Sequence, residues 1–335
     1  MRLSLAKEAV KAAWSVGRVP LLVGEPGIGK SEAVFQATAD VGRQVWDVWN
    51  LVQENPVELK GYGFPDREAG VTRILPLARV KALTEYPPGV IFFDELGQAT
   101  PVTMCAAAPA LLKDPTGRRR FGSTYVDVDH YLAAATNARE HRSLVNALPD
   151  FFASRLTELP VEFHFDDWDA WAAAHGIHDF VLGYGRANRD SIHHHVAGKR
   201  SPLARSWTFV SDFERLPIQD STKRALIEGT IGPEATAKYW KLRDSVHLLP
   251  RMEDILQGRG GKIPDEKGLQ FLVVTALAAR TTPANIGHVL AYLKPFGEEF
   301  ADLYMTDCRR KDPKNALLNI RAVQEWIAEH ETKEI

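Results

Sequence analysis

One run of residues combines glycines, a lysine and a serine in an order that suits phosphate binding. The run consists of Gly24, Glu25, Pro26, Gly27, Ile28, Gly29, Lys30 and Ser31, which fits the pattern G-x-x-x-x-G-K-[ST]. Glycines let the backbone curl so that successive N–H groups point inward at an anion. Lys30 adds a mobile positive charge for the β- and γ-phosphates, and the Ser31 hydroxyl is a hard oxygen ligand for Mg²⁺. An apolar strand before the run and a helix after it favour a Mg²⁺–ATP site over a chance match in a glycine-rich turn.

Two carboxylates follow an apolar strand directly. The strand is expected over 90–93, and Asp94 and Glu95 come next. Ligands of open α/β sheets bind at the carboxyl ends of the strands. We therefore expect Asp94 to hold the Mg²⁺ shell and Glu95 to polarise the attacking water. An ordinary strand end before a helix cap is the alternative, and the neighbouring phosphate-binding run favours catalysis.

Asn137 and Arg155 are two further candidates for this predicted site. Asn137 follows an apolar strand and could orient the lytic water, or it could simply start a turn. Arg155 ends a short helix ahead of a strand. A guanidinium supplied by a neighbouring subunit can stabilise charge on the γ-phosphate. The alternative for Arg155 is a surface ion pair with a carboxylate such as Glu158.

A second arginine, Arg205, falls at the expected start of a helix. Positive charge is unfavourable at that end of a helix dipole, so an anionic partner is expected for it. The nucleotide phosphates are the functional candidate, and an acidic side chain is the plainer one.

The elements around these residues alternate between strands and helices in the first half of the chain. Apolar strands are expected over 19–23, 44–52, 90–93, 129–135 and 159–163, and helices over 3–16, 31–41, 75–85 and 100–112. Alternation of this kind indicates βαβ units and a parallel sheet flanked by helices. The first domain is therefore expected over 1–165.

After residue 165 the sequence predicts helices only, beginning with one capped by Asp166 or Asp167. The glycine-rich stretch 257–264 looks like a linker. We expect a helical lid over 166–260 and a further helical extension over 261–335.

The bulk composition is that of a soluble globular protein. Of 335 residues, 45% are apolar and 25% charged, and the net charge of −2 gives no field that would draw the chain onto nucleic acid or an anionic membrane. No run is long and apolar enough for a membrane helix, and the N-terminus does not resemble a secretory signal. Two cysteines form no disulfide framework. A cytoplasmic location is expected.

Three further features have a plain and a functional interpretation. The basic run 118–120 is the main support for a nucleic-acid partner, together with Lys199 and Arg200. Tyr62 and Phe64 flank a glycine and could grip a polypeptide, or fold back onto the domain. The triplet 193–195 is all histidine, and a solvated loop is favoured over a metal site because no cysteine or acidic residue stands at ligand spacing.

Taken together, these residues resemble the MoxR branch of the AAA+ ATPases, and in particular its compact single-ATPase members. In this resemblance the run 24–31 corresponds to Walker A, 90–95 to Walker B, Asn137 to sensor 1, Arg155 to the arginine finger and Arg205 to sensor 2. The segment 118–122 corresponds to a hairpin that precedes sensor 1. The finger segment reads Ala-Ser-Arg-Leu where many members have Asp-Arg-Phe, and residues 261–335 match only loosely.

The resemblance implies a P-loop NTPase core with an all-α lid, acting on ATP with Mg²⁺. It implies a homo-oligomeric ring, usually a hexamer, with ATP between subunits, and chaperone-like remodelling of other proteins. A partner with a von Willebrand factor A domain is a further implication. A nucleic-acid-stimulated motor or loader is the less favoured alternative, and no membrane partner is expected.

Overall fold

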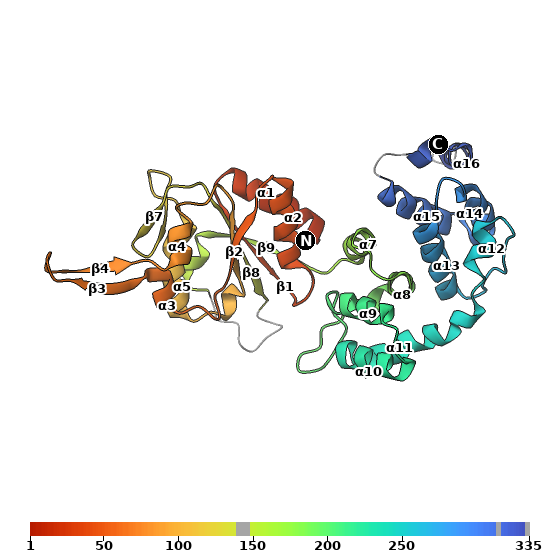
Figure 1. Ribbon diagram of the computed structural model, residues 1–335, viewed down its shortest axis with the longest axis horizontal. Helices are drawn as coiled ribbons and strands as arrows, with labels where there is room; N and C mark the ends of the chain where they lie inside the picture. Colours follow the sequence, from red (N-terminus) through yellow and green to blue (C-terminus); the bar gives the residue numbers. More distant parts are fainter. Residues whose placement is uncertain (139–147, 313–315, 332–335) are drawn as a thin grey trace. The chain divides into compact units, whose positions relative to one another are not determined.

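The computed structural model of the chain describes residues 1–138, 148–312 and 316–331. The chain forms two compact units, residues 1–164 and 165–335 (Figure 1). Each unit is described by itself. The predicted three-part division into 1–165, 166–260 and 261–335 stays a prediction.

A five-stranded parallel sheet forms the centre of the first unit. Its strands lie in the order β2-β5-β8-β1-β9, and every neighbouring pair is parallel. The strands are β1 (Val19–Gly24), β2 (Val45–Asn50), β5 (Val90–Asp94), β8 (Tyr131–Asn137) and β9 (Leu156–Pro160). The predicted parallel sheet flanked by helices is thus confirmed at the level of fold class. The last strand begins and ends earlier than expected, because its residues pair with β1 from Val19 onward.

Helices cover both faces of this sheet (Figure 1). On one face α1 (Leu3–Ser15) and α2 (Lys30–Asp40) pack against a core that includes Leu22 and Phe92. The other face packs against a core with Leu21 and Phe93, formed with α3 (Pro56–Lys60), α4 (Ala78–Ala82), α5 (Pro101–Ala107) and η2 (Ala108–Leu111). Successive residues of one strand point to opposite faces. Strands buried on both faces are therefore apolar throughout, as the sequence pattern predicted.

Two antiparallel hairpins complete the first unit. The first pairs β3 (Tyr62–Asp66) with β4 (Val71–Leu75), and the second pairs β6 (Arg119–Phe121) with β7 (Thr124–Val126). The helix predicted over 75–85 is wrong at its start, because Leu75 ends β4 and the helix α4 runs only over Ala78–Ala82. Pro76 follows Leu75, and a residue before proline is disfavoured in helical conformation. A short helix α6 (Asp150–Ala153) precedes β9.

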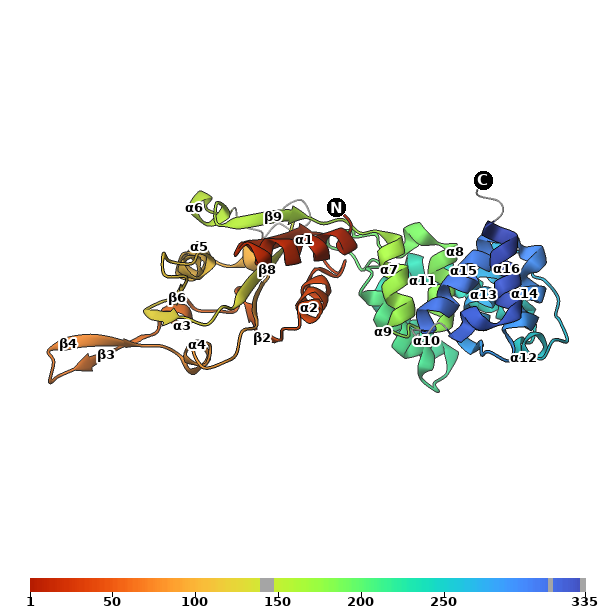
Figure 2. The same ribbon diagram turned by 90° about the horizontal axis from the view of Figure 1, so that it is seen from above.

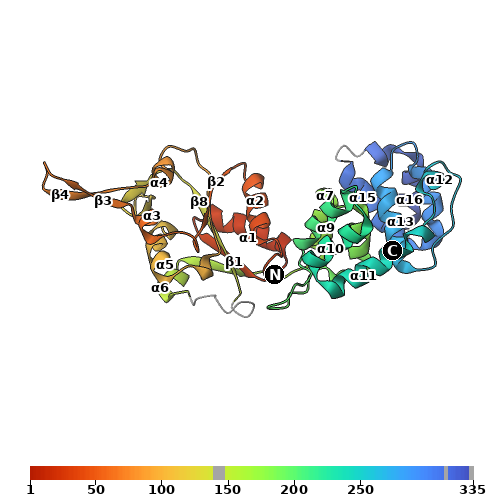
Figure 3. The same cartoon turned by 60° about the horizontal axis from the view of Figure 1, so that its bottom comes forward.

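The described part of the second unit contains helices and no strand (Figure 3). Its α-helices are α7 (Phe165–Ala174), α8 (Asp179–Ala187), α9 (Ser206–Arg215), α10 (Asp220–Ile231), α11 (Pro233–Asp244), α12 (Met252–Leu256), α13 (Lys267–Arg280), α14 (Ile286–Leu293), α15 (Glu298–Lys311) and α16 (Arg321–Glu331). Short 3-10 turns occur at Arg189–Ser191, Ser245–Leu248, Lys294–Phe296 and Ala316–Asn319.

A buried charge network joins four of these helices. The Arg186 guanidinium on α8 donates to Asp169 on α7 at 2.6 Å and to Asp307 on α15 at 2.6 Å. It also donates to the Thr275 hydroxyl on α13 at 3.0 Å. The two carboxylates hold the pKa of Arg186 above its ordinary value in spite of burial. Residues on both sides of position 260 therefore share one polar network.

Candidate functional site

The phosphate-binding run forms the turn between β1 and α2. Gly24 ends β1, and α2 begins at Lys30. Gly27 and Gly29 have φ of +74° and +110°, in the region that favours glycine. A Cβ on Gly24 would lie 2.3 Å from the Val161 carbonyl oxygen. The backbone of this turn therefore requires its glycines, and it leads directly into the N-terminus of a helix, where anions bind.

Lys30 lies across the turn with its side chain almost fully buried. Its ammonium donates to the carbonyl oxygens of Gly24 at 3.0 Å and Glu25 at 2.7 Å, and to Asn137 Oδ1 at 3.0 Å. Asn137 reaches it because β8 neighbours β1, with Asn137 opposite Gly24 in the register. The lysine of the predicted phosphate site and the asparagine predicted to orient water thus lie in contact.

Ser31 and Asp94 bring two oxygen atoms together at the same edge of the sheet. The Ser31 hydroxyl donates to Asp94 Oδ2 at 3.1 Å, and Asp94 Oδ1 accepts the N–H of Glu95 at 2.9 Å. Mg²⁺ is commonly held by one or two protein oxygens, with substrate phosphates and water completing its shell. A glycine-lined turn, a buried lysine and this oxygen pair fit a magnesium–triphosphate group.

Glu95 has an unusual backbone conformation. Its φ of 54° makes it the only non-glycine residue with positive φ in the described part of the chain. Such a conformation costs on the order of 1 kcal/mol and persists where the surroundings enforce it. The turn after Glu95 is held to β8, because the Gly97 N–H donates to the Thr136 hydroxyl at 3.0 Å. The half-buried carboxylate is therefore presented beside Asp94 by a constrained turn.

Two polar groups near this site were not predicted from the sequence. Asn50 ends β2 and lies opposite Asp94 in the register. Its Oδ1 atom, and the Nε2 atom of Gln98 in the turn after β5, are buried without a hydrogen-bond partner among the described residues. Asn50 could have been found by the signal that identified Asn137, a polar residue at the end of an expected strand.

Arg155 lies at the end of the sheet where the parallel strands begin, whereas the phosphate-binding turn lies at the end where they finish. It immediately precedes β9, whose first residue, Leu156, pairs with Val19 at the start of β1. A strand rise of about 3.3 Å per residue separates Val19 from Gly24 by roughly 16 Å. The Arg155 guanidinium lies 5.7 Å from the Phe151 ring and forms no ion pair with Glu158 in the described residues. Within one chain, Arg155 is not brought to the turn.

Arg205 belongs to the helical unit. It precedes α9 as its N-cap, and its side chain is exposed. In the part of the chain that the structure describes, its guanidinium has no acidic partner. Both interpretations of Arg205, a nucleotide phosphate or an acidic side chain as its partner, therefore stay predictions.

The basic run 118–120 is largely engaged within the fold. Arg119 is buried and donates to the Ala110 carbonyl oxygen at 2.8 Å, and burial lowers its pKa to about 10. Arg118 pairs with Asp114 at 3.0 Å and lies over the Tyr125 ring. Two of the three arginines in this run therefore have partners within the protein.

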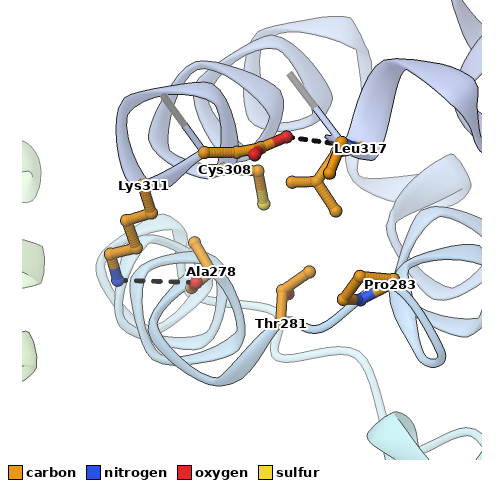
Figure 4. Close-up of a pocket in the computed structure, with 8 residues that line it drawn as sticks. Ala278, Thr281, Pro283, Cys308, Lys311 and Leu317 are labelled. Atoms are coloured by element: carbon orange, nitrogen blue, oxygen red, sulfur yellow. Dashed lines mark hydrogen bonds between the residues drawn. The ribbon is translucent and has the colours of Figure 1, made fainter. Parts of the chain in front are cut away.

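The helical unit contains a small pocket between α13 and α15 (Figure 4). Its lining residues are Ala278, Thr281, Pro283, Cys308, Lys311, Asp312, Ala316 and Leu317. Lys311 donates to the Ala278 carbonyl oxygen and Asp312 accepts the Leu317 N–H at 2.6 Å, so both charged groups bond to the pocket's own backbone. Burial raises the pKa of Cys308 to about 11, which makes its thiol a poor nucleophile.

The chain was compared with protein-family models and with curated proteins. No protein-family model matches it, and no curated protein matches it significantly. In the described residues, no helix combines the length and the apolar character needed to cross a bilayer.

Proposed function

We propose that this chain is a P-loop ATPase of the AAA+ type, which binds Mg²⁺–ATP at residues 24–31 and hydrolyses it with Glu95. One observation carries the proposal: side chains from three separate segments meet at one sheet edge. Lys30 contacts Asn137 at 3.0 Å, and Ser31 contacts Asp94 at 3.1 Å. Each of these side chains is of the type that a triphosphate, a magnesium ion or an attacking water requires.

The residues divide the work by their chemistry. The backbone N–H groups of the turn and the Lys30 ammonium bind the phosphate oxygens, while Ser31 and Asp94 hold the metal. Bound Mg²⁺ neutralises charge that develops on the phosphates. Glu95 orients and polarises the water, and Asn137, which already bonds Lys30, fixes the water's position relative to the γ-phosphate.

Assembly into a homo-oligomeric ring is part of the proposal. Arg155 lies roughly 16 Å along the sheet from the phosphate turn of its own chain. A guanidinium there can act on the phosphates held by a neighbouring copy, as arginine fingers do. Arg205 is proposed as a second phosphate ligand. Remodelling of other proteins, a hexameric state, a cytoplasmic location and a von Willebrand factor A partner stay predictions from the resemblance.

Three variants test the proposal by separating binding from turnover. Lys30→Ala should lose nucleotide binding, whereas Glu95→Gln should bind ATP and lose turnover by roughly a hundredfold or more. Arg155→Ala should also bind ATP without turning it over. Mixed with Glu95→Gln, Arg155→Ala should regain part of the activity, because one interface then contains both an intact Glu95 and an intact Arg155. A wild-type protein that binds no nucleotide with Mg²⁺ present would refute the ATPase, and failed complementation would refute the shared site.

A further inference from the structure

The hairpin of β3 and β4 is almost entirely exposed. It extends away from the rest of the first unit in all three views (Figures 1, 2 and 3). Every residue of the segment 62–75 is exposed except Asp66, which is partly buried. At its base, Gly61 has φ of +91°, and a Cβ there would meet the Leu75 carbonyl oxygen at 2.5 Å. The base of the hairpin therefore requires a glycine, while its two strands lie in solvent.

One face of this hairpin combines four large apolar side chains with the Asp66–Arg73 ion pair. Residues directly opposite each other in an antiparallel pair point to the same face. The register pairs Tyr62 with Leu75, Phe64 with Arg73 and Asp66 with Val71. Tyr62, Phe64, Leu75 and Val71 therefore share one face, and each is about half exposed, between 49% and 54%. A contiguous exposed group of large apolar side chains in a folded protein indicates a binding surface.

The outer edge of β4 is open. The sheet contains only β3 and β4, so in the described structure no other strand pairs with either of them. Pro65 removes one N–H from β3, whereas β4 reads Val-Thr-Arg-Ile-Leu and keeps all its N–H groups. An exposed edge of this kind can accept another strand through its backbone groups. The geometry of β4 thus suits an extended polypeptide.

The charge of the hairpin also favours a polypeptide over nucleic acid. Residues 62–75 contain two acidic and two basic residues, so their net charge is zero. One of the basic residues, Arg73, bonds Asp66 at 2.6 Å. Nucleic-acid binding depends on a surplus of positive charge facing the phosphates. Tyr62 and Phe64 could stack on bases, but the hairpin supplies no such surplus.

We propose that this hairpin binds an extended polypeptide segment, which adds to the β4 edge and places apolar side chains on the face formed by Tyr62, Phe64, Leu75 and Val71. The ligand is a segment with apolar or aromatic residues at alternate positions, such as an unfolded protein exposes. The inference deepens the proposed function by naming a polypeptide-binding surface. It depends on the ATPase only for the coupling of binding to turnover, so the binding itself is measured without nucleotide.

The probe is a soluble fluorescent peptide that alternates phenylalanine or valine with threonine, tested on the full chain by anisotropy. We expect Tyr62→Ser with Phe64→Ser to weaken binding about tenfold or more, which is about 1.4 kcal/mol. Ile74→Ser is the matched control, because Ile74 is 45% exposed but pairs with Gly63 on the other face. It should change binding less than about threefold. The single variants should each show part of the loss.

Two further measurements test strand addition. A peptide with proline at the threonine positions cannot donate those backbone hydrogen bonds, and it should bind about tenfold more weakly. Amide hydrogen exchange at residues 71–75 should slow when the first peptide binds. No binding by the wild-type chain, equal binding by the double variant, or protection away from β4 would overturn the proposal. So would binding of an oligothymidine, but not of the peptide, through the same two aromatic residues.

The peptide-binding proposal and the ATPase proposal can be refuted independently. Lys30→Ala should bind the peptide like wild type without nucleotide, and the double hairpin variant should keep basal ATP hydrolysis. Peptide binding without ATP hydrolysis would support the peptide-binding hairpin and refute the proposed ATPase. ATP hydrolysis without peptide binding would support the ATPase and refute the peptide-binding hairpin.

Discussion

Ser31 and Asp94 are the two proposed protein ligands of the metal ion, one a hydroxyl and the other a carboxylate. The Ser31 hydroxyl donates to Asp94 at 3.1 Å, so the two side chains that would hold Mg²⁺ lie in contact. A hydroxyl is a weaker ligand than a carboxylate, and waters can replace it in part. We therefore expect Ser31→Ala to bind ATP and to need about tenfold more Mg²⁺ for half-maximal turnover.

Ser31→Thr provides the control for this prediction, because threonine keeps the hydroxyl and also satisfies the phosphate-loop pattern. A titration of turnover against Mg²⁺ at saturating ATP measures the effect. If Ser31→Ala follows the wild-type Mg²⁺ curve, Ser31 is not a metal ligand.

His130 gives the first unit a pH dependence that can be derived from its contacts. Its Nδ1 accepts the Gly89 N–H at 3.2 Å and its Nε2 lies 2.8 Å from the Leu83 carbonyl oxygen, so the ring is neutral with the proton on Nε2. Burial lowers the pKa of His130 below its ordinary value of 6.5. The unfolded chain therefore takes up the proton first as pH falls. The stability that neutral His130 contributes is fully present above its pKa in the unfolded chain. This contribution is lost as the pH drops from 6.5 toward the pKa of His130 in the folded chain.

Hydrogen exchange of β5 and β8 between pH 8 and pH 5 measures this effect on the first unit alone. The pKa of His178 is also lowered by burial, but His178 lies in the second unit, so different peptides report it. His130→Gln should be less stable than wild type at pH 8 by about 1–3 kcal/mol, through an imperfect replacement of two hydrogen bonds. It should also lose less further stability on acidification than wild type. An equal loss in both proteins would assign the pH dependence to other groups.

At the scale of elements, the turn between β1 and α2 depends on close backbone packing. A Cβ at position 24 would lie 2.3 Å from the Val161 carbonyl oxygen and 2.9 Å from the Ile28 side chain. Gly24→Ala should therefore destabilise the first unit by about 1–3 kcal/mol and weaken nucleotide binding.

Gly42→Ala is a useful comparison for Gly24→Ala. Gly42 has φ of +66°, but a Cβ there would meet nothing within 4 Å. It should lose stability through backbone strain, by about 1 kcal/mol, and keep normal nucleotide affinity. Denaturant unfolding and nucleotide titration of both variants separate the two effects. Normal nucleotide affinity in Gly24→Ala would show that the turn tolerates displacement.

Two central strands of the sheet could be predicted from the sequence because they are apolar along most of their length and end in polar residues. Val90–Asp94 and Tyr131–Asn137 show both signals, and their ends supply Asp94 and Asn137 to the candidate site. The β3–β4 hairpin could not be predicted in this way, because it packs against no core and leaves no buried face for a pattern to record. The position of Arg155 relative to Gly24 depends on the pairing of β9 with β1, which the sequence does not specify.

At the scale of the whole chain, the helical unit depends on contacts between distant residues. Arg186 bonds Asp169, which is 17 residues away, and Asp307, which is 121 residues away. No local pattern predicts such a pairing, because each residue alone looks like an ordinary surface charge. The predicted linker over 257–264 stands between Arg186 and Asp307 in sequence. The network therefore ties the segment after the linker to the segment before it.

Breaking this network should destabilise the unit strongly. The side chains of Arg186 and Asp307 are 1% and 4% exposed, so Asp307→Ala leaves a buried arginine with one carboxylate fewer. Removal of one partner from a buried pair costs about 3–5 kcal/mol. Arg310→Ala is the matched control, because Arg310 bonds the same two aspartates from a side chain that is 31% exposed. Its loss should cost about 1 kcal/mol or less.

Denaturant unfolding, followed by hydrogen exchange in α8 and α13, measures both variants within the intact chain. If the network holds the two segments together, Asp307→Ala should weaken protection in α8 and in α13 alike, although these helices lie on opposite sides of the linker. A loss confined to α13 and α15 would instead indicate that residues after 260 unfold on their own. The predicted boundary at 260 would then mark a real domain, and Arg186 would be a contact between two independently stable parts.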